Sequence, residues 1–247
     1  MQSFPRIAAV ELPRVAVPSI DIDSVDIALS TTRSVRRRIA WERPVEREVI
    51  EQCIDVATQA PTGLSAEAWR FLILVDPERK ARMAEIYRGA FAELGAVRAD
   101  YARRTGIEPP REKPAHRFLA ERMHEMPALI LVCSHGRPDA QADTVARQVG
   151  FYGSVLPAAW SLMVALRARG IGSTWTSLHL MRERETAAAF GIPDDVTQTV
   201  LLPIGYTRDA VLRRATRKPA HQVTFWDDWG TRATTRATEA PTRQPAR

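Results

Sequence analysis

Arginine and hydroxyl side chains stand together in two short basic segments near opposite ends of this chain. Residues 32–36 read TRSVR and residues 215–219 read ATRKP. A guanidinium offers a planar fork of N–H donors, and a neighbouring serine or threonine adds one more hydrogen bond, so each segment suits a phosphate monoester. A third segment, residues 60–71 (APTGLSAEAWRF), has the composition of a structured turn. We expect the three segments to form one ligand site.

The elements that must position these segments follow from the spacing of the apolar residues. One helical face is apolar over residues 45–60, between Pro44 and Pro61, and a longer amphipathic helix is predicted from Pro77 to about Arg104, with an apolar stripe that reaches Tyr101. Short apolar runs predict strands at 70–76, 128–133 and 199–206, the first of them buried on both faces. Three further elements are predicted: a shorter amphipathic stretch before residue 127, a largely apolar segment at 145–169 interrupted by Pro157, and a helix at about 182–190.

Helical stretches separate the predicted strands, and no fixed repeat is visible. This order favours an α+β fold in which a mixed central sheet is sandwiched by helices. We expect an extended N-terminal arm at residues 1–22, one domain at 23–230, and a disordered tail at 231–247, where large apolar side chains are almost absent.

The candidate ligand-binding segments resemble motifs of the nitroreductase family. They occur in the same order along the chain, and the resemblance extends from about residue 26 to about residue 225. Residues 33–36 (RSVR) resemble the first phosphate-binding motif of that family, and residues 60–71 resemble its A-P-S-G-x-N-x-Q-P-W turn. Residues 170–176 (GIGSTWT) resemble the G-L-G-S stretch, whose continuation lies along the flavin. Residues 203–206 (PIGY) and 217–219 (RKP) resemble the closing strand and the last phosphate-binding arginine.

The resemblance implies a nitroreductase-like fold, an intertwined homodimer and bound FMN at the subunit interface. FMN would be reduced by NADH or NADPH and would then reduce a small electron-poor acceptor such as a nitroaromatic or a quinone. No catalytic side chain is expected, because the flavin carries the hydride. The implied cofactor-binding residues are Arg33, Ser34, Arg36, Pro61, Thr62, Gly63, Ser65, Trp175, Thr176, Ser177 and Arg217. Trp175 fits a core position equally well, and Gly170 to Gly172 fit a helix cap, since no third glycine or following helix makes them a dinucleotide fingerprint.

Some residues depart from the family pattern and leave alternatives open. Thr32 replaces one arginine of the first motif, and its hydroxyl can still donate; the turn has Ser65 where Asn is usual and Ala68 where Pro is usual. Glu67 and the Arg-Lys-Pro end are similar to the iodotyrosine deiodinase branch, although the residues around Tyr101 do not reproduce its substrate lid. Reductive dehalogenation, or FMN sequestration without turnover, are therefore the alternative functions.

The composition of the chain limits the classes of protein to which it can belong. The 247 residues are 45% hydrophobic and 26% charged, which is typical of a soluble globular protein, and no apolar run approaches the ~18 residues of a membrane span. Without an apolar block at the start, we expect a cytoplasmic protein. Four Arg and one Glu in the last seventeen residues supply half of the net charge of +6, so nucleic-acid binding is not expected. Cys53 and Cys133 are expected to be buried thiols, and no metal-ligand spacing is present.

Overall fold

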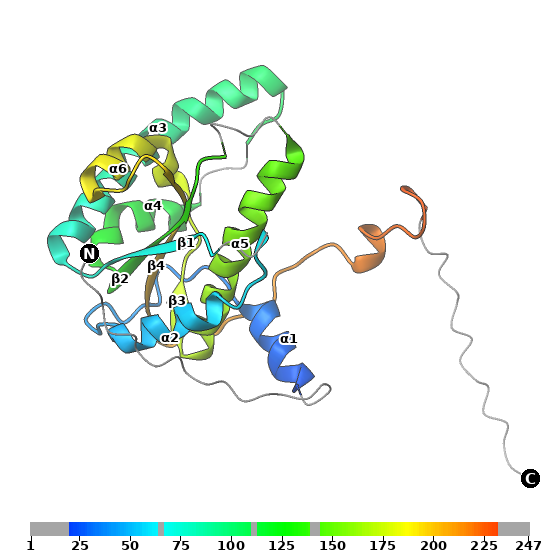
Figure 1. The fold of residues 1–247 in the computed structure, drawn as a ribbon, viewed down its shortest axis with the longest axis horizontal. Coiled ribbons are helices and arrows are strands. Elements are labelled where there is room, and N and C mark those ends of the chain that lie inside the picture. Colours follow the sequence, from blue (N-terminus) through cyan, green and yellow to red (C-terminus); the bar gives the residue numbers. More distant parts are fainter. Residues whose placement is uncertain (1–19, 64–66, 110–112, 139–143, 232–247) are drawn as a thin grey trace, which may run out of the picture. The chain divides into compact units, whose positions relative to one another are not determined.

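The computed structural model describes residues 20–63, 67–109, 113–138 and 144–231, and the chain divides into two compact units, residues 1–213 and 214–247. The first unit contains the helices and strands discussed below (Figure 1). The second contains a short 3-10 helix, Ala220–Gln222. The expected N-terminal arm lies outside the described residues except for its last three, and the expected tail lies outside them except for Thr231.

Four strands form one sheet in the order β1-β2-β4-β3. Their bounds are Trp69–Leu74 (β1), Ala128–His135 (β2), Ile171–Ser173 (β3) and Val196–Tyr206 (β4). Each adjacent pair is antiparallel, and parallel pairing among the described residues is limited to isolated bridges such as Ser34 with Ser173. The predicted α+β class is confirmed. The ladders of the sheet are antiparallel, whereas the sequence analysis predicts a mixed sheet.

Both faces of the sheet are covered by helices, which explains why β2 is a continuous apolar run. Because side chains alternate along a strand, Ala128, Ile130 and Val132 enter one hydrophobic cluster, while Leu129 and Leu131 enter another. The first cluster includes side chains of helices α2 (Arg47–Ala57) and α5 (Val145–Ala168), and the second those of α3 (Pro77–Thr105), α4 (Pro114–Arg122) and α6 (Glu183–Phe190). Short 3-10 helices lie at Met123–Glu125 and Leu178–Arg182.

Strand β1 lies at the edge of the sheet. Among the described residues it pairs with β2 on one side only, and its middle residues are half-buried rather than fully buried. Phe71 and Ile73 nevertheless pack against one hydrophobic cluster and Leu72 and Leu74 against the other, so the expectation of a strand packed on both faces is confirmed, with less complete burial than in β2.

Helix α3 begins and ends where the sequence predicts. The Asp76 side chain accepts a hydrogen bond from the Arg79 N–H at 2.9 Å, and Gly106 ends the helix in the left-handed region at φ 68°. The buried stripe stops at Ala90, however, and Val97 and Tyr101 are exposed. The prediction that the stripe is buried as far as Tyr101 is thus wrong for the second half of the helix. The first half of α3 packs on the sheet, and the second half extends past the sheet (Figure 1).

Helix α5 is the longest apolar segment and runs through Pro157 without ending. Within the described part of the chain it is the one helix whose length and apolar character would allow it to cross a membrane. Packing in the protein core also explains this apolar character, because Val155, Leu162 and Leu166 are fully buried in the hydrophobic cluster between the sheet and α2 and α5. Its first half also leaves Val145 and Val149 exposed.

One helix has no counterpart in the sequence prediction. Helix α1, Ile22–Thr31, directly precedes the first basic segment, and the Asp21 side chain caps it by accepting from the Ser24 N–H at 3.0 Å. None of its residues is buried in this chain.

Candidate functional site

The first basic segment is fastened along the end of β3 and the residues that follow it. The Val35 N–H donates to the Ser173 carbonyl at 2.9 Å, and the Thr174 hydroxyl donates to the Val35 carbonyl at 2.8 Å. Thr174 is fully buried, so this tie is shielded from water. Two segments that the sequence places about 140 residues apart are therefore side by side.

Two glycines allow this close approach. Gly172 and Gly205 face each other in the β3–β4 ladder. A Cβ atom on Gly172 would lie 2.9 Å from the Val35 Cβ, and one on Gly205 would lie 2.6 Å from the Ile39 Cγ2. The chain around residues 35–39 thus packs on a surface without side chains. Gly170, at φ 75°, is the residue with the expected helix-capping role.

The basic residues of this segment differ in environment. Arg33 and Ser34 are exposed, whereas Arg36 is half-buried and its buried Nε has no hydrogen-bond partner within the described part of the chain. Burial lowers the pKa of Arg36, since water no longer stabilises its charge. No carboxylate from the described residues pairs with Arg36, so its guanidinium is available for an anionic or electron-rich ligand.

Thr32 does not have the role that the sequence allows for it. Its side chain is buried, and its hydroxyl donates to the Ala28 carbonyl at 2.6 Å in the last turn of α1. The expectation that this hydroxyl is free to donate to a phosphate is wrong, because it completes the end of a helix that the sequence prediction missed.

The segment after β3 contains the ring-side residues implied by the resemblance. Thr176 makes two backbone hydrogen bonds with Leu201 of β4, and its hydroxyl lies 2.9 Å from the Tyr87 hydroxyl. Trp175 is half-buried and packs against the core cluster that contains α2 and α5, while Ser177 is exposed. Trp175 is thus partly a core residue, and Thr176 has the more defined polar environment.

Tyr87 is the polar residue of this site that sequence reasoning missed. Its spacing places it on the apolar stripe of α3, and it is only 4% exposed. A buried tyrosine needs a hydrogen-bond partner for its hydroxyl. A tyrosine on this stripe is therefore a signal that a polar group can face it.

The glycine-containing turn lies beside α5. Pro61 and Gly63 are exposed and Thr62 is half-buried, and a Cβ atom on Gly63 would lie 3.4 Å from the Gly150 carbonyl oxygen. Ser65 lies outside the described residues. Its predicted role stays a prediction.

Arg217 belongs to the second compact unit, where its side chain is exposed. Its predicted part in phosphate binding stays a prediction as well.

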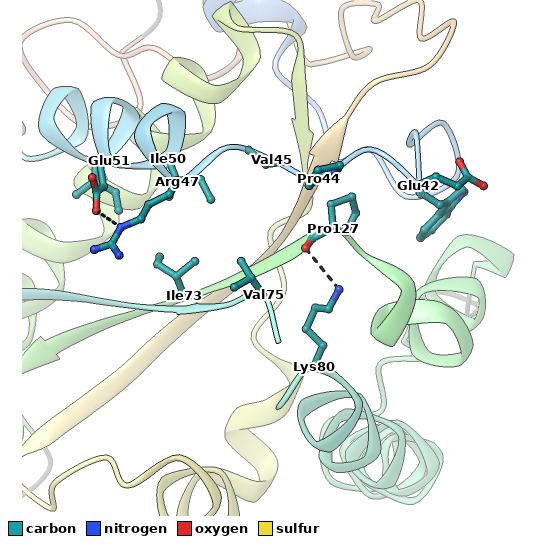
Figure 2. Close-up of a pocket in the computed structure, with 12 residues that line it drawn as sticks. Glu42, Pro44, Val45, Arg47, Ile50, Glu51, Ile73, Val75, Lys80 and Pro127 are labelled. Carbon is teal, nitrogen blue, oxygen red and sulfur yellow. Dashed lines mark hydrogen bonds and ion pairs between the residues drawn. The ribbon is translucent and has the colours of Figure 1, made fainter. Parts of the chain in front are cut away.

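Two cavities bear on the position of the site. One, of about 260 Å³, is lined by residues of the first basic segment, Ser34 and Arg36 among them. Another, of about 650 Å³, lies between α2, β1 and the start of α3, where Lys80 extends toward the Pro127 carbonyl (Figure 2). None of the predicted site residues lines this second cavity. We therefore place the candidate site at the first basic segment.

Comparison with known proteins agrees with the motif order. The family model described as "Nitroreductase family" matches residues 29–206, well over half of the chain. This chain belongs to the nitroreductase family. The resemblance noted from the motifs is thereby confirmed.

Several characterised relatives of this nitroreductase family member are iodotyrosine deiodinases. Iodotyrosine deiodinase 1 of Rattus norvegicus is 30% identical over 202 residues, which cover 79% of this chain and 66% of that protein. The iodotyrosine deiodinase of Thermotoga neapolitana is 30% identical over 188 residues, which cover 73% of this chain and 88% of that protein.

Solved structures show the same fold. A nitroreductase-like protein from Bacillus cereus has a TM-score of 0.60 at 20% identity, covering 81% of this chain and 94% of that one. A crystal structure of oxidised iodotyrosine deiodinase bound to FMN and 3-iodo-L-tyrosine has a TM-score of 0.57 at 22% identity. The match covers 82% of this chain and 100% of that one. The nitroreductase-like fold is confirmed.

A buried histidine follows the ring-side segment of this family member. His179 is fully buried, and neither ring nitrogen has a hydrogen-bond partner among the residues that the structure describes. Burial lowers the pKa of His179 from 6.5 to about 4, so the folded protein holds the imidazole neutral.

We expect His179 to make the protein less stable in mild acid. The unfolded imidazole takes up a proton near pH 6.5, but the folded one remains neutral down to about pH 4. The unfolded state thus binds more protons within this window, and stability falls as the pH drops through it, by about 2 kcal/mol at pH 5 relative to pH 7.5. Urea unfolding at both pH values should show a smaller loss for His179→Leu than for wild type. Equal losses in His179→Leu and wild type would contradict the assignment, and the exposed His124→Gln serves as the control.

Proposed function

We propose that this protein is an FMN-dependent oxidoreductase that takes a hydride from NADH or NADPH and passes it to a small electron-poor acceptor. Nitroaromatics and quinones are the acceptor classes. The observation that carries the proposal is the half-buried Arg36, which has no carboxylate partner among the described residues and lies on a segment tied to the ring-side residues. Family membership supports the choice of FMN as the ligand.

The residues present fit a flavin mononucleotide. A phosphate monoester needs several charge-assisted donors, each contributing about 1.5–3 kcal/mol. Arg33 and Ser34 offer exposed donors next to the cavity lined by the basic segment, and the half-buried Arg36 lines the same cavity. The part of Arg217 in phosphate binding stays a prediction from the sequence.

The chain itself would bind and orient the cofactor. When bound, FMN would supply the acceptor and donor of the hydride. Thr176 is half-buried and its backbone is fixed to β4, and the half-buried Trp175 packs against the core. The turn at Pro61, Thr62 and Gly63 would supply backbone N–H and carbonyl groups. No side chain of this set needs to act as nucleophile or base.

An anaerobic spectrum of the purified protein tests this proposal. Protein loaded with FMN should show flavin absorption that bleaches on addition of NADH or NADPH and returns when a quinone or nitroaromatic is added. Flavin that binds but is not bleached by either nicotinamide would contradict the proposed turnover and would favour sequestration of FMN.

Reductive dehalogenation is the second candidate, and the iodotyrosine deiodinase relatives favour it. The two differ in product rather than in cofactor, because dehalogenation releases halide from an aromatic ring. Halide release from a halogenated phenol, with dithionite as reductant, would establish this second function. Its absence, together with nicotinamide-driven quinone reduction, would leave the first proposal.

We propose that the protein works as a homodimer. Helix α1 has no buried residue in this chain, yet it carries four large apolar side chains that are exposed, Ile22, Val25, Ile27 and Leu29. The first half of α5 adds the exposed Val145 and Val149. Apolar side chains of this number on two helices are typical of a surface that packs on a second protein. A second copy of the chain is the partner that the family resemblance implies.

The dimer proposal predicts the effect of a double substitution in α1. Ile22→Ser with Ile27→Ser should raise the dimer dissociation constant at least tenfold, on the order of 1.4 kcal/mol, because both side chains would leave an apolar contact. Sedimentation velocity over a concentration series measures it. Val75→Ser, at an exposed position just after β1, is the control. A monomeric wild-type protein, or an unchanged dimer in the double variant, would contradict the proposal.

A further inference from the structure

The first basic segment has a second anchor, on the side of α1. The Nη2 atom of Arg167, in the last turn of α5, donates to the Thr31 hydroxyl at 3.3 Å. This direction is fixed, because a guanidinium carries donors only. The Thr31 hydroxyl in turn donates to the Ile27 carbonyl at 2.6 Å. Among the described residues, the bond from Arg167 is the side-chain hydrogen bond that joins α1 to another element.

The two anchors hold the basic segment on both sides of its exposed donors. Thr31 is held by Arg167, and Ser34 forms a bridge with Ser173. Arg167 and Ser173 belong to one short stretch of chain, because β3 begins almost directly after α5 ends. The bridge is parallel, so the two stretches run in the same direction. The exposed Arg33 therefore lies between two fixed points.

Helix α1 depends on this anchor more than a buried helix would. None of its residues is buried in this chain, and it lies beside the end of α5 (Figure 1). A helix with few buried contacts opens locally at a low cost in free energy. Loss of the hydrogen bond from Arg167 would therefore let the end of α1 move, together with the residues that follow it.

The side chain of Arg167 also carries a cost. Its Nε is buried and has no hydrogen-bond partner among the described residues. A buried donor without a partner loses the hydrogen bonds that water would give it. Methionine would fill the same space without this cost, so the stability of the fold alone does not account for an arginine here. A role in ordering the ligand site accounts for both the hydrogen bond and its cost.

We propose that Arg167 is a positioning residue, which acts through Thr31 to hold Arg33 and Ser34 in place for the phosphate group of the cofactor. The inference rests on the proposed function for the identity of the ligand. The geometry assigns Arg167 itself no contact with the cofactor or with a substrate.

The Arg167→Met variant tests this role through a comparison of FMN with riboflavin, which has the same ring and lacks the phosphate. Both flavins are titrated into apoprotein and followed by fluorescence quenching. We expect FMN to bind about tenfold more weakly to the variant, comparable to the loss of one charge-assisted hydrogen bond. Riboflavin should bind as it does to wild type. Arg169→Met is the matched control, because Arg169 donates within α5 to the Ala165 carbonyl, and neither affinity should change.

The ratio of the two affinities separates a role at the phosphate from a structural role. Equal losses for FMN and riboflavin would indicate general damage to the site and would overturn the inference. An unchanged FMN affinity with a lower urea midpoint would reduce Arg167 to a structural residue and would also overturn it. Wild-type protein that takes up neither flavin would instead contradict the proposed function.

A double-mutant cycle with FMN alone keeps the test decisive if riboflavin binds too weakly to titrate. Thr31→Val deletes the hydroxyl through which Arg167 acts and keeps the branched shape of the side chain. If the two residues act as one unit, the double variant should lose no more FMN affinity than either single variant. Losses that add would show that Arg167 does not act through Thr31, and the inference would fail.

Discussion

Replacing Arg36 with methionine is expected to weaken FMN binding about 100-fold and to leave the apoprotein at least as stable as wild type. Charge-assisted hydrogen bonds contribute about 1.5–3 kcal/mol each, and a loss of about 3 kcal/mol corresponds to roughly a hundredfold change in affinity. Arg36 can make more than one such bond, because a guanidinium carries several N–H donors and no carboxylate of the described residues pairs with this one. FMN titration into apoprotein measures the affinity.

The stability part of this prediction follows from the burial of the charge. Burial lowers the pKa of Arg36, which shows that the folded apoprotein disfavours the charged guanidinium. Methionine fills a similar volume without a charge, so it removes this desolvation penalty. A residue that stabilised the fold would behave in the opposite way, with a lower urea midpoint in the variant.

Arg37→Met is the matched control for Arg36→Met. Arg37 is exposed and lies over the Phe118 ring, with 5.2 Å from its guanidinium carbon to the ring centroid. Its replacement should change FMN affinity by less than a factor of about three, because its guanidinium is exposed to water and lies over Phe118, and exposed ionic contacts contribute little. Equal losses of affinity in both variants would indicate a diffuse basic surface and would contradict a defined role for Arg36.

The parts of the fold that the sequence predicts best are those with a strong periodic pattern. Residues 128–133 form a central strand because their side chains enter two different hydrophobic clusters, which requires apolar residues at every position. Helix α3 has both a capping Asp76 and a terminating Gly106, so its two ends are set by local chemistry. Patterns of this kind report on the surroundings of each residue rather than on distant partners.

The errors arise where a residue's role depends on a partner that is distant in the chain. Val97 and Tyr101 continue the apolar spacing of α3, but no element covers them in this chain. Thr32 is in the right place for phosphate binding by sequence, yet its hydroxyl bonds to α1. Tyr87 is a core residue by spacing and a site residue by its contact with Thr176. Sequence spacing determines which face a residue is on, and only the fold determines what lies opposite.

The candidate site also depends on residues that have no functional group. Gly172 and Gly205 let residues 35–39 lie directly against the sheet, and the buried Thr174 hydroxyl then holds Val35 there. The sequence indicates a helix-capping role for residues 170–172; Gly170 has the φ of such a cap, whereas Gly172 permits the close approach of Val35. The position of the Arg36 guanidinium is therefore set by the absence of a side chain on β3.

Gly172→Ala is accordingly expected to lower the free energy of unfolding by about 2 kcal/mol, as overpacking of a filled site does. The new Cβ would meet the Val35 Cβ and the Thr207 Cγ2, each at 2.9 Å, and the Val35 Cβ cannot move without its backbone. Val35 should therefore shift away from Ser173 and carry Arg36 with it, so FMN affinity should fall at least tenfold. Urea unfolding and FMN titration of the same preparation measure both effects.

Gly95→Ala on α3 is the control, because its Cβ would meet nothing within 4 Å and a helical alanine should raise stability by about 1 kcal/mol. If Gly172→Ala lowers stability but leaves FMN affinity unchanged, the flavin does not depend on the position of residues 34–36, and the site must be sought elsewhere in the fold.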